Sequence, residues 1–162
     1  MSASTNRPGA SEGKPAFKIR AGRRGDVEAI SALLVELGYP QGADMATVHW
    51  VISHPETETL IAADGGDKPV GMLTLSHRPQ LRLRGRIVTI DELVVQAAWR
   101  RKGVGRELVK RAVERSRVLS ARRLELLSPV TDDIAMLFCR EMGFVESGTS
   151  VMCLAALDIG RR

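Results

Sequence analysis

Three groups of residues in the sequence are capable of chemistry: a basic turn, a pair of carboxylates and a single cysteine in an amphipathic segment. The basic turn runs from Arg100 to Arg106 and places Gly103 and Gly105 at the start of a helical pattern. The first N–H groups of a helix have no partner inside it, and the helix dipole favours negative charge there. The residue types and their spacing therefore predict a turn that binds phosphate groups.

Two common phosphate-binding turns do not fit this segment. A dinucleotide-binding turn needs a third glycine where this chain has Leu108, and a P-loop needs a Gly-Lys-Ser/Thr ending that is absent. The turn must therefore belong to another class of phosphate site.

Two carboxylates, Asp91 and Glu92, interrupt the apolar segment that precedes the turn. Burying a carboxylate is costly unless it is paired, protonated or functional. Adjacent side chains of a regular strand point to opposite faces, so we expect one carboxylate on the solvent side and one in the site. Glu92 could act as a base or form an ion pair with a nearby arginine, and the residues alone leave both open.

The elements that must position these residues follow from the apolar pattern. Strands are expected at residues 17–20, 60–63, 70–76, 87–95 and 123–127, with another beginning at 144–145 and a final hairpin at 150–156. Helices are expected at 27–37, 44–53, 104–119 and 132–142, with Asp26 and Thr131 as N-caps and stops at Gly38 and Gly143. Residues 64–67 read as a hairpin turn and 78–86 as a polar connection. This order predicts an α+β (mixed α/β) fold with an antiparallel half followed by parallel crossovers.

The strand, basic turn and helix of residues 88–119 resemble the acyl-CoA-binding motif of the GNAT N-acetyltransferases. The R-x-x-G-x-G pattern falls on Arg100, Gly103 and Gly105, after an E-L-x-V strand end. The resemblance extends over residues 17–156. It implies the GNAT acyl-CoA N-acyltransferase fold, a mixed central sheet with splayed parallel strands flanked by helices.

The resemblance also implies roles for individual residues. The main chain of the strand end would bind the pantetheine arm of acetyl-CoA, and residues 101–106 would surround its pyrophosphate. Glu92 would accept a proton from the substrate ammonium, commonly through water. The cofactor-binding set is Leu93, Val94, Val95, Arg100, Arg101, Lys102, Gly103, Val104, Gly105, Arg106 and Asp132.

A second signature, residues 132–144, resembles the family's N-x-x-A-x-x-F-Y-x-x-x-G-F pattern with two departures. Asp132 stands where asparagine is usual, and Cys139 stands where a tyrosine commonly protonates the departing CoA thiolate. The Cys139 thiol could donate that proton instead, or the residue could be a small packing residue. Both alternatives stay open.

Composition limits the classes of protein that the chain can represent. Its 162 residues are 44% apolar and 27% charged with a net charge of +5, which is ordinary for a globular domain. No apolar run reaches the ~20 residues of a membrane span, and the two cysteines form no C-x-x-C pair. We expect a cytoplasmic protein with a domain at residues 17–157, a disordered tail at 1–16 and a short tail at 158–162. The three histidines lack metal-ligand spacing, so no metal site is expected.

The function indicated is transfer of an acetyl group from acetyl-CoA to a primary amine of a small molecule or peptide, by direct attack. An alternative is a non-catalytic module that binds or senses acyl-CoA, because Cys139 replaces the usual acid. Nucleic-acid binding through the basic residues 100–123 ranks below both, since 4% aromatic content supplies too few stacking platforms. The apolar final hairpin, residues 150–157, also suggests a homodimer.

Overall fold

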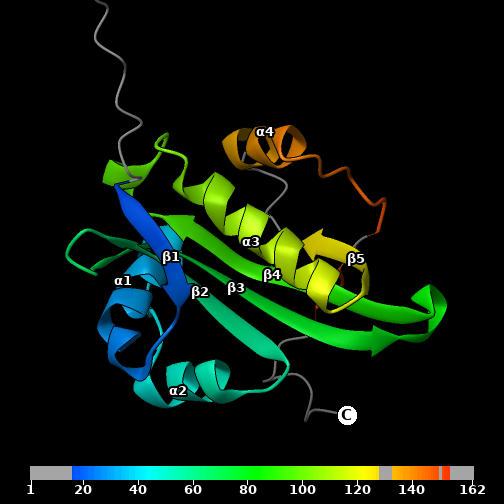
Figure 1. Cartoon of the computed structure of the whole chain (residues 1–162), viewed down its shortest axis with the longest axis horizontal. Coiled ribbons are helices and arrows are strands. Elements are labelled where there is room, and N and C mark those ends of the chain that lie inside the picture. The colour runs from blue at the N-terminus through cyan, green and yellow to red at the C-terminus, as the bar shows by residue number, and fades with distance from the viewer. Residues whose placement is uncertain (1–15, 128–132, 150, 154–162) are drawn as a thin grey trace, which may run out of the picture. The chain divides into compact units, whose positions relative to one another are not determined.

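The structure, a computed structural model, describes residues 16–127, 133–149 and 151–153. They belong to two compact units, residues 1–127 and 128–162, which are described separately. The strands are β1 (Phe17–Ala21), β2 (Thr57–Asp64), β3 (Pro69–Gln80), β4 (Gly85–Val95) and β5 (Ala121–Leu126). The α-helices are α1 (Val27–Leu37), α2 (Met45–Ser53), α3 (Val104–Val118) and α4 (Asp133–Glu141) (Figure 1).

The first unit is built on one five-stranded sheet in the order β1-β2-β3-β4-β5. The first three pairings are antiparallel, whereas β4 and β5 run parallel. The α3 helix supplies the crossover between the parallel strands, as a parallel connection requires. The mixed sheet with an antiparallel half and a parallel crossover is thus confirmed.

Helices cover both faces of this sheet (Figure 1). On one face, α1 and α2 pack over a buried cluster of Ile30, Leu33, Val48, Ile61, Ala63, Met72 and Val94. On the other, α3 buries Leu108, Val109 and Ala112. Gly71 of β3 lets α3 approach closely, because a Cβ there would lie 3.1 Å from Cγ1 of Val104. The N-terminus of α3 is therefore held against the end of β4.

The hairpin joining β3 and β4 is longer than the sequence suggests. Residues 78–86 were expected to form a connection, but β3 continues to Gln80 and β4 begins at Gly85, with the two paired throughout. Main-chain pairing does not depend on side-chain polarity, so the exposed polar residues here do not end the strands. Pro79 is tolerated because β2 pairs with β3 only as far as Ser76, which leaves the proline without a second neighbour strand.

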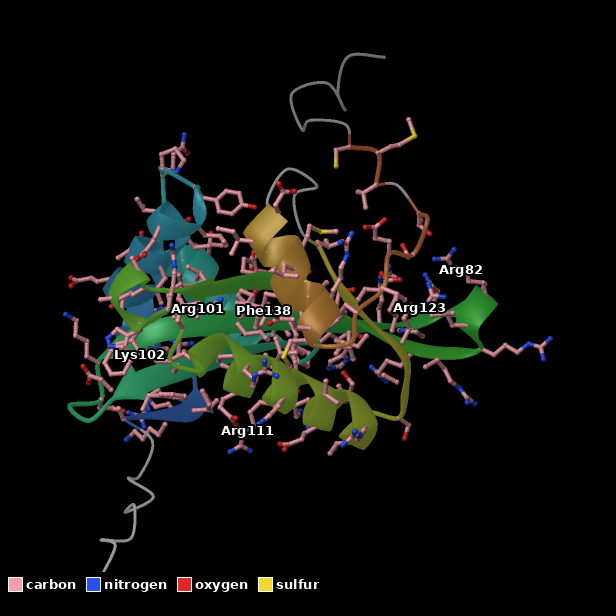
Figure 2. All side chains as sticks on the ribbon, turned by 90° about the horizontal axis from the view of Figure 1, so that it is seen from above. Arg82, Arg101, Lys102, Arg111, Arg123 and Phe138 are labelled. Carbon is pink, nitrogen blue, oxygen red and sulfur yellow. The ribbon has the colours of Figure 1, made fainter. Side chains whose placement is uncertain are left out.

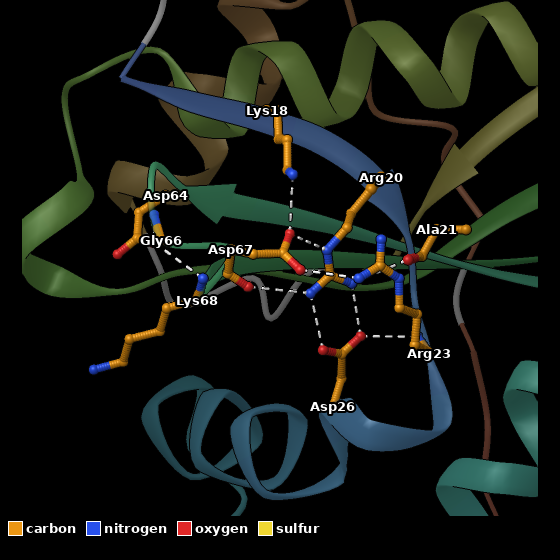
Figure 3. Close-up of polar contacts among 9 residues, drawn as sticks. All are labelled: Lys18, Arg20, Ala21, Arg23, Asp26, Asp64, Gly66, Asp67 and Lys68. Carbon is orange, nitrogen blue, oxygen red and sulfur yellow. Dashed lines mark hydrogen bonds and ion pairs between the residues drawn. The ribbon is translucent and has the colours of Figure 1, made fainter.

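Arg20, whose side chain is only 10% exposed, links three segments of the first unit (Figure 3). Nη1 and Nη2 of Arg20 donate to the two carboxylate oxygens of Asp26 at 2.8 and 2.9 Å, and its Nε donates to Asp67 at 2.9 Å. This joins β1, the β2–β3 turn and the start of α1. Asp26 occupies the expected N-cap position, but its carboxylate binds Arg20 and the Arg23 N–H instead of the α1 backbone. Hydrogen bonding from the Arg20 side chain is the main reason that the pKa of Asp26 lies below its ordinary value.

The second unit contains α4, and this helix ends where the sequence predicts. Gly143 has a φ of +91°, and its N–H donates to the Arg140 carbonyl at 3.0 Å. Thr131 and Asp132, the expected cap and first helical residue, lie outside the described residues.

Two other expectations for the second unit are wrong. The apolar spacing of the helix at residues 132–142 predicts an inward-facing Ile134, but Ile134 is 80% exposed, while Cys139 is 8% exposed. Five helical residues turn the chain by about 140° beyond a full circle, so the two cannot share one face. Residues 144–149 and 151–153 adopt no strand. Gly148, with φ +67°, interrupts the segment in a conformation that a strand does not allow. Ser150 and residues 154–157 lie outside the description.

No helix within the described ranges is long and apolar enough to cross a membrane.

Candidate active site

The pairing between the parallel strands β4 and β5 covers only the first half of β4. Their pairing runs from Arg86 to Ile90 on β4, and residues 91–95 have no β5 partner in the described part of the chain. The main chain of β4 beyond Ile90 therefore has an edge facing away from β3 with N–H and C=O groups to satisfy. This edge contains Leu93, Val94 and Val95. The Val95 carbonyl already accepts a hydrogen bond from Nε of Arg100 at 3.0 Å.

The turn after β4 leads into the N-terminus of α3. A 3₁₀ turn covers Ala97–Trp99, Arg101 has a φ of +63°, and Gly103 has a φ of +85° at the N-cap position. Gly103 has no side chain with which to cap the helix. The first N–H groups of α3 therefore remain available as hydrogen-bond donors. Unpaired N–H groups at a helix N-terminus, next to a turn with left-handed backbone at Arg101 and Gly103, suit an anion.

The four cations of this turn have different surroundings. Arg100 forms an ion pair with Glu36 at 3.3 Å and donates a hydrogen bond to the Val95 carbonyl. These two contacts hold the turn in place. Arg101 and Lys102 lie at the turn before α3 (Figure 2), and Nζ of Lys102 sits 5.0 Å from the centroid of the Trp99 ring. Within the described residues, Arg101 and Arg106 are exposed and form no ion pair. These two, with Lys102, are the positive charges available to a phosphate group.

Glu92 sits beneath α1 and α2, where it lines a cavity of about 110 Å³. Its carboxylate has no hydrogen-bond or ion-pair partner among the described residues, so the arginine ion pair left open by the sequence is not formed there. Burial raises the pKa of Glu92, and the charge of Asp91 raises it further. A carboxylate with a raised pKa is a stronger base, which suits proton removal from an ammonium group.

A β-bulge at Asp91 changes the direction in which the two carboxylates point. Thr74 pairs with Glu92 but the next residue, Leu75, pairs with Ile90, so Asp91 is the extra residue on β4. Asp91 bonds the side chain of Ser76, which shares a face of β3 with Thr74. Both carboxylates therefore lie on the same face of the sheet. The expectation that adjacent residues point to opposite faces is wrong here, because a bulge breaks the alternation.

Two threonines that line the site could not be recognised as site residues from the sequence. Thr59 of β2 and Thr74 of β3 are directly paired, and Thr74 is paired with Glu92 of β4. All three line the same cavity. Both threonines are more than nine-tenths buried, and neither hydroxyl has a hydrogen-bond partner among the described residues. Only the strand register, which the sequence does not supply, brings them beside Glu92.

Cys139 lies in the last turn of α4, and its side chain is buried. Asp132, the remaining member of the expected cofactor set, lies outside the described residues. Among the residues that the structure describes, no three His, Cys, Asp or Glu side chains are grouped closely enough to hold a metal ion.

Comparison with protein families matches residues 28–144 to the acetyltransferase (GNAT) family. No curated protein matches the chain by sequence. Among solved structures, the chain is similar to one from Agrobacterium tumefaciens strain C58 that is assigned as an acetyltransferase. The two are 26% identical with a TM-score of 0.76, over 85% of this chain and 99% of that one.

Two more distant structures share the fold. A ribosomal-protein-alanine N-acetyltransferase from Brucella melitensis biovar Abortus 2308 is 19% identical with a TM-score of 0.71, over 86% of this chain and all (100%) of that one. An aminoglycoside acetyltransferase from an uncultured soil metagenomic sample is 18% identical with a TM-score of 0.73, over 87% and 96%. The fold expected from the sequence is thereby confirmed.

Proposed function

Because this chain belongs to the acetyltransferase (GNAT) family, we propose that it transfers an acetyl group from acetyl-CoA to a primary amine of a small molecule or peptide. The observation that carries the proposal is the end of β4. There, a strand edge and a carboxylate without partners among the described residues, together with a cationic helix N-terminus, occur within one continuous segment, residues 91–106.

The described residues fit the chemistry of acetyl-CoA. The unpaired edge of β4 at Leu93 and Val94 offers main-chain groups to the amides of a pantetheine arm, as another strand would. The first N–H groups of α3 and the free cations Arg101, Lys102 and Arg106 match a pyrophosphate in charge. Arg100 supports the turn through Glu36 and Val95.

Acetyl-CoA would supply a thioester whose carbon–sulfur bond breaks as the amine nitrogen bonds to the carbonyl carbon, which yields an amide and a thiol. An alkylamine with a pKa near ~10 is mostly protonated at neutral pH and cannot attack in that form. Glu92 takes up the ammonium proton, directly or through water. Its burial and the adjacent Asp91 raise its pKa and so improve it as a base.

Cys139 is the candidate donor of a proton to the departing sulfur. The supporting observation is its position in the family signature, where tyrosine is usual. Its burial fits a packing residue equally well. In that case water protonates the thiolate, which is a tolerable leaving group without help.

The test is thiol release from acetyl-CoA over a panel of primary amines, run beside calorimetric titration of acetyl-CoA. Transfer predicts saturable binding and thiol release that depends on the amine. Tight binding with no release over the whole panel would instead favour the non-catalytic acyl-CoA-binding module.

A further inference from the structure

An apolar wall surrounds most of the cavity beside Glu92. Helices α1 and α2 and strand β3 supply its large apolar side chains: Ile30, Leu34, Val48, Val51, Ile52 and Met72. Three of these, Ile30, Val48 and Met72, also belong to the buried cluster under the two helices. A ligand that enters the cavity therefore exchanges water for contact with hydrocarbon, which favours apolar groups.

The threonines in the lining do not offset this apolar character. The Oγ1 atoms of Thr59 and Thr74 have almost no accessible surface, so neither hydroxyl can bond to a ligand in the cavity. The hydroxyl of Thr47 donates to Oδ2 of Asp44 at 2.7 Å. A polar group deep in the cavity would thus lack a side-chain partner among the described residues, apart from Glu92.

Glu92 is the only charged residue in the described lining. Asp44 lies outside the lining, and its carboxylate accepts hydrogen bonds from both the N–H and the hydroxyl of Thr47. One carboxylate balances one ammonium group, whereas a second buried positive charge would remain unpaired. The cavity therefore suits a single positive charge at Glu92 and hydrocarbon elsewhere.

We propose that this cavity selects the acceptor, and that the acceptor is a primary monoamine with a short alkyl substituent. The inference rests on the proposed acetyl transfer. The amine nitrogen lies at the Glu92 carboxylate, and the alkyl group packs against the apolar side chains of α1 and α2.

The size of the cavity sets the length of the alkyl group. The volume is about 110 Å³, and a cavity of about 150 Å³ accommodates benzene, so by proportion about four or five non-hydrogen atoms fit. An amine nitrogen with three or four carbons fills this space. Acceptors with several ammonium groups do not match the lining, because it pairs only one of them.

Three acceptors of equal size test the polarity of the lining: butylamine, 3-aminopropan-1-ol and 1,3-diaminopropane. They differ in one terminal group, which is a methyl, a hydroxyl or an ammonium. We expect kcat/KM for butylamine, measured by thiol release, to exceed that for the amino alcohol by about fivefold or more, because the buried hydroxyl has no partner. The diamine should be used least, since it adds an unpaired charge. Equal use of the three, or a preference for either polar acceptor, would overturn the proposal.

A series from methylamine to butylamine measures the apolar contact itself. Each buried methylene group raises affinity about fourfold, so kcat/KM should rise by about that factor for each added carbon. A flat series would contradict the proposal.

A matched pair of variants assigns the preference to this cavity. Ala43→Leu adds three carbons to the lining just before α2, so the ratio of kcat/KM between butylamine and methylamine should fall toward one. Ala46→Leu makes the same change at an exposed position of α2 outside the lining, and should keep the wild-type ratio. An unchanged ratio in a folded Ala43→Leu variant would refute the assignment, and the two amine series in the wild-type protein test the proposal without any variant.

Ligand-observed NMR with CoA present separates a failure of this inference from a failure of the proposed function. If no amine is acetylated, the proposed function fails, but weaker binding of butylamine to Ala43→Leu than to Ala46→Leu still supports the cavity assignment. Absence of butylamine binding to the wild-type protein at millimolar concentration then refutes the inference as well. Acetylation of amines without the alkyl preference refutes the inference and leaves the proposed function standing.

Discussion

Replacing Glu92 by glutamine tests the proposed base directly. Glutamine keeps the size and hydrogen-bonding capacity of the side chain but cannot accept a proton. At neutral pH only about one alkylamine molecule in ~10³ is the free base. Among the described residues no other carboxylate lines the cavity, and Asp91 is hydrogen-bonded to Ser76. We therefore expect kcat/KM to fall about 10²–10⁴-fold at pH 7.

The loss should shrink as pH rises, since each unit of pH supplies about ten times more free amine until the amine pKa is reached. The assay is thiol release measured as kcat/KM from pH 6 to 10 for both proteins. Acetyl-CoA affinity should not change, because β4 offers main-chain groups to the cofactor. A variant that retains the wild-type pH–rate profile would refute the assignment of Glu92.

The same substitution should stabilise the protein at neutral pH. The folded-state pKa of Glu92 is raised above its ordinary value of 4.5, so the folded state binds the proton more tightly than the unfolded state. Stability is then lost as pH rises through the ordinary and folded pKa values. Glu92→Gln should therefore melt above wild type at pH 7, and the two should converge below about pH 4. A lower melting temperature at pH 7 would show that the carboxylate is paired.

Three further substitutions test other parts of the account. Gly103→Val should cost about 1–2 kcal/mol of stability, because Gly103 has a φ of +85°, and should weaken the acetyl-CoA binding that calorimetry measures. The control Gly65→Ala, in open space with no positive φ, should change neither stability nor binding. Unchanged acetyl-CoA affinity in Gly103→Val would contradict the assignment of this turn to phosphate binding. Asp26→Ala should cost about 1.5–3 kcal/mol in denaturant unfolding, because the Arg20 guanidinium loses its two hydrogen bonds to Asp26 and keeps the one to Asp67. The difference should vanish as pH falls below about 3.8 through the lowered pKa of Asp26, and equal stability at pH 7 would remove Arg20–Asp26 as a tie. Cys139→Ser should slow turnover markedly if the thiol is the proton donor, and should lower only the melting temperature if the residue packs.

Much of the fold was predictable because its signals are local. Gly38 ends α1 with a φ of +110°, as its residue type predicts. The helix α2 begins within one residue of its predicted start, where Asp44 caps it by accepting from the Thr47 N–H. The shape of the turn before α3 was also predictable from a local signal, since Gly103 adopts the left-handed conformation that glycine favours.

The parts that the sequence could not supply depend on pairing between distant segments. The bulge at Asp91 arises from the register of β4 against β3, and no residue type marks it. The same register places Thr59 and Thr74 in the cavity with Glu92. Arg100 stays a predicted phosphate ligand, and its contact with Glu36, 64 residues away in the sequence, adds a supporting role for the turn that the sequence does not reveal.

The most direct test of the account follows an isotope-labelled acetyl group from acetyl-CoA into an amine. Wild-type protein is incubated with labelled acetyl-CoA and a small primary amine, and the product is identified by mass spectrometry while free thiol is titrated. The account predicts a labelled N-acetyl amide formed in equal amount to the thiol, with both falling together in Glu92→Gln. Thiol release without labelled amide, or saturable acetyl-CoA binding with neither product, would contradict it.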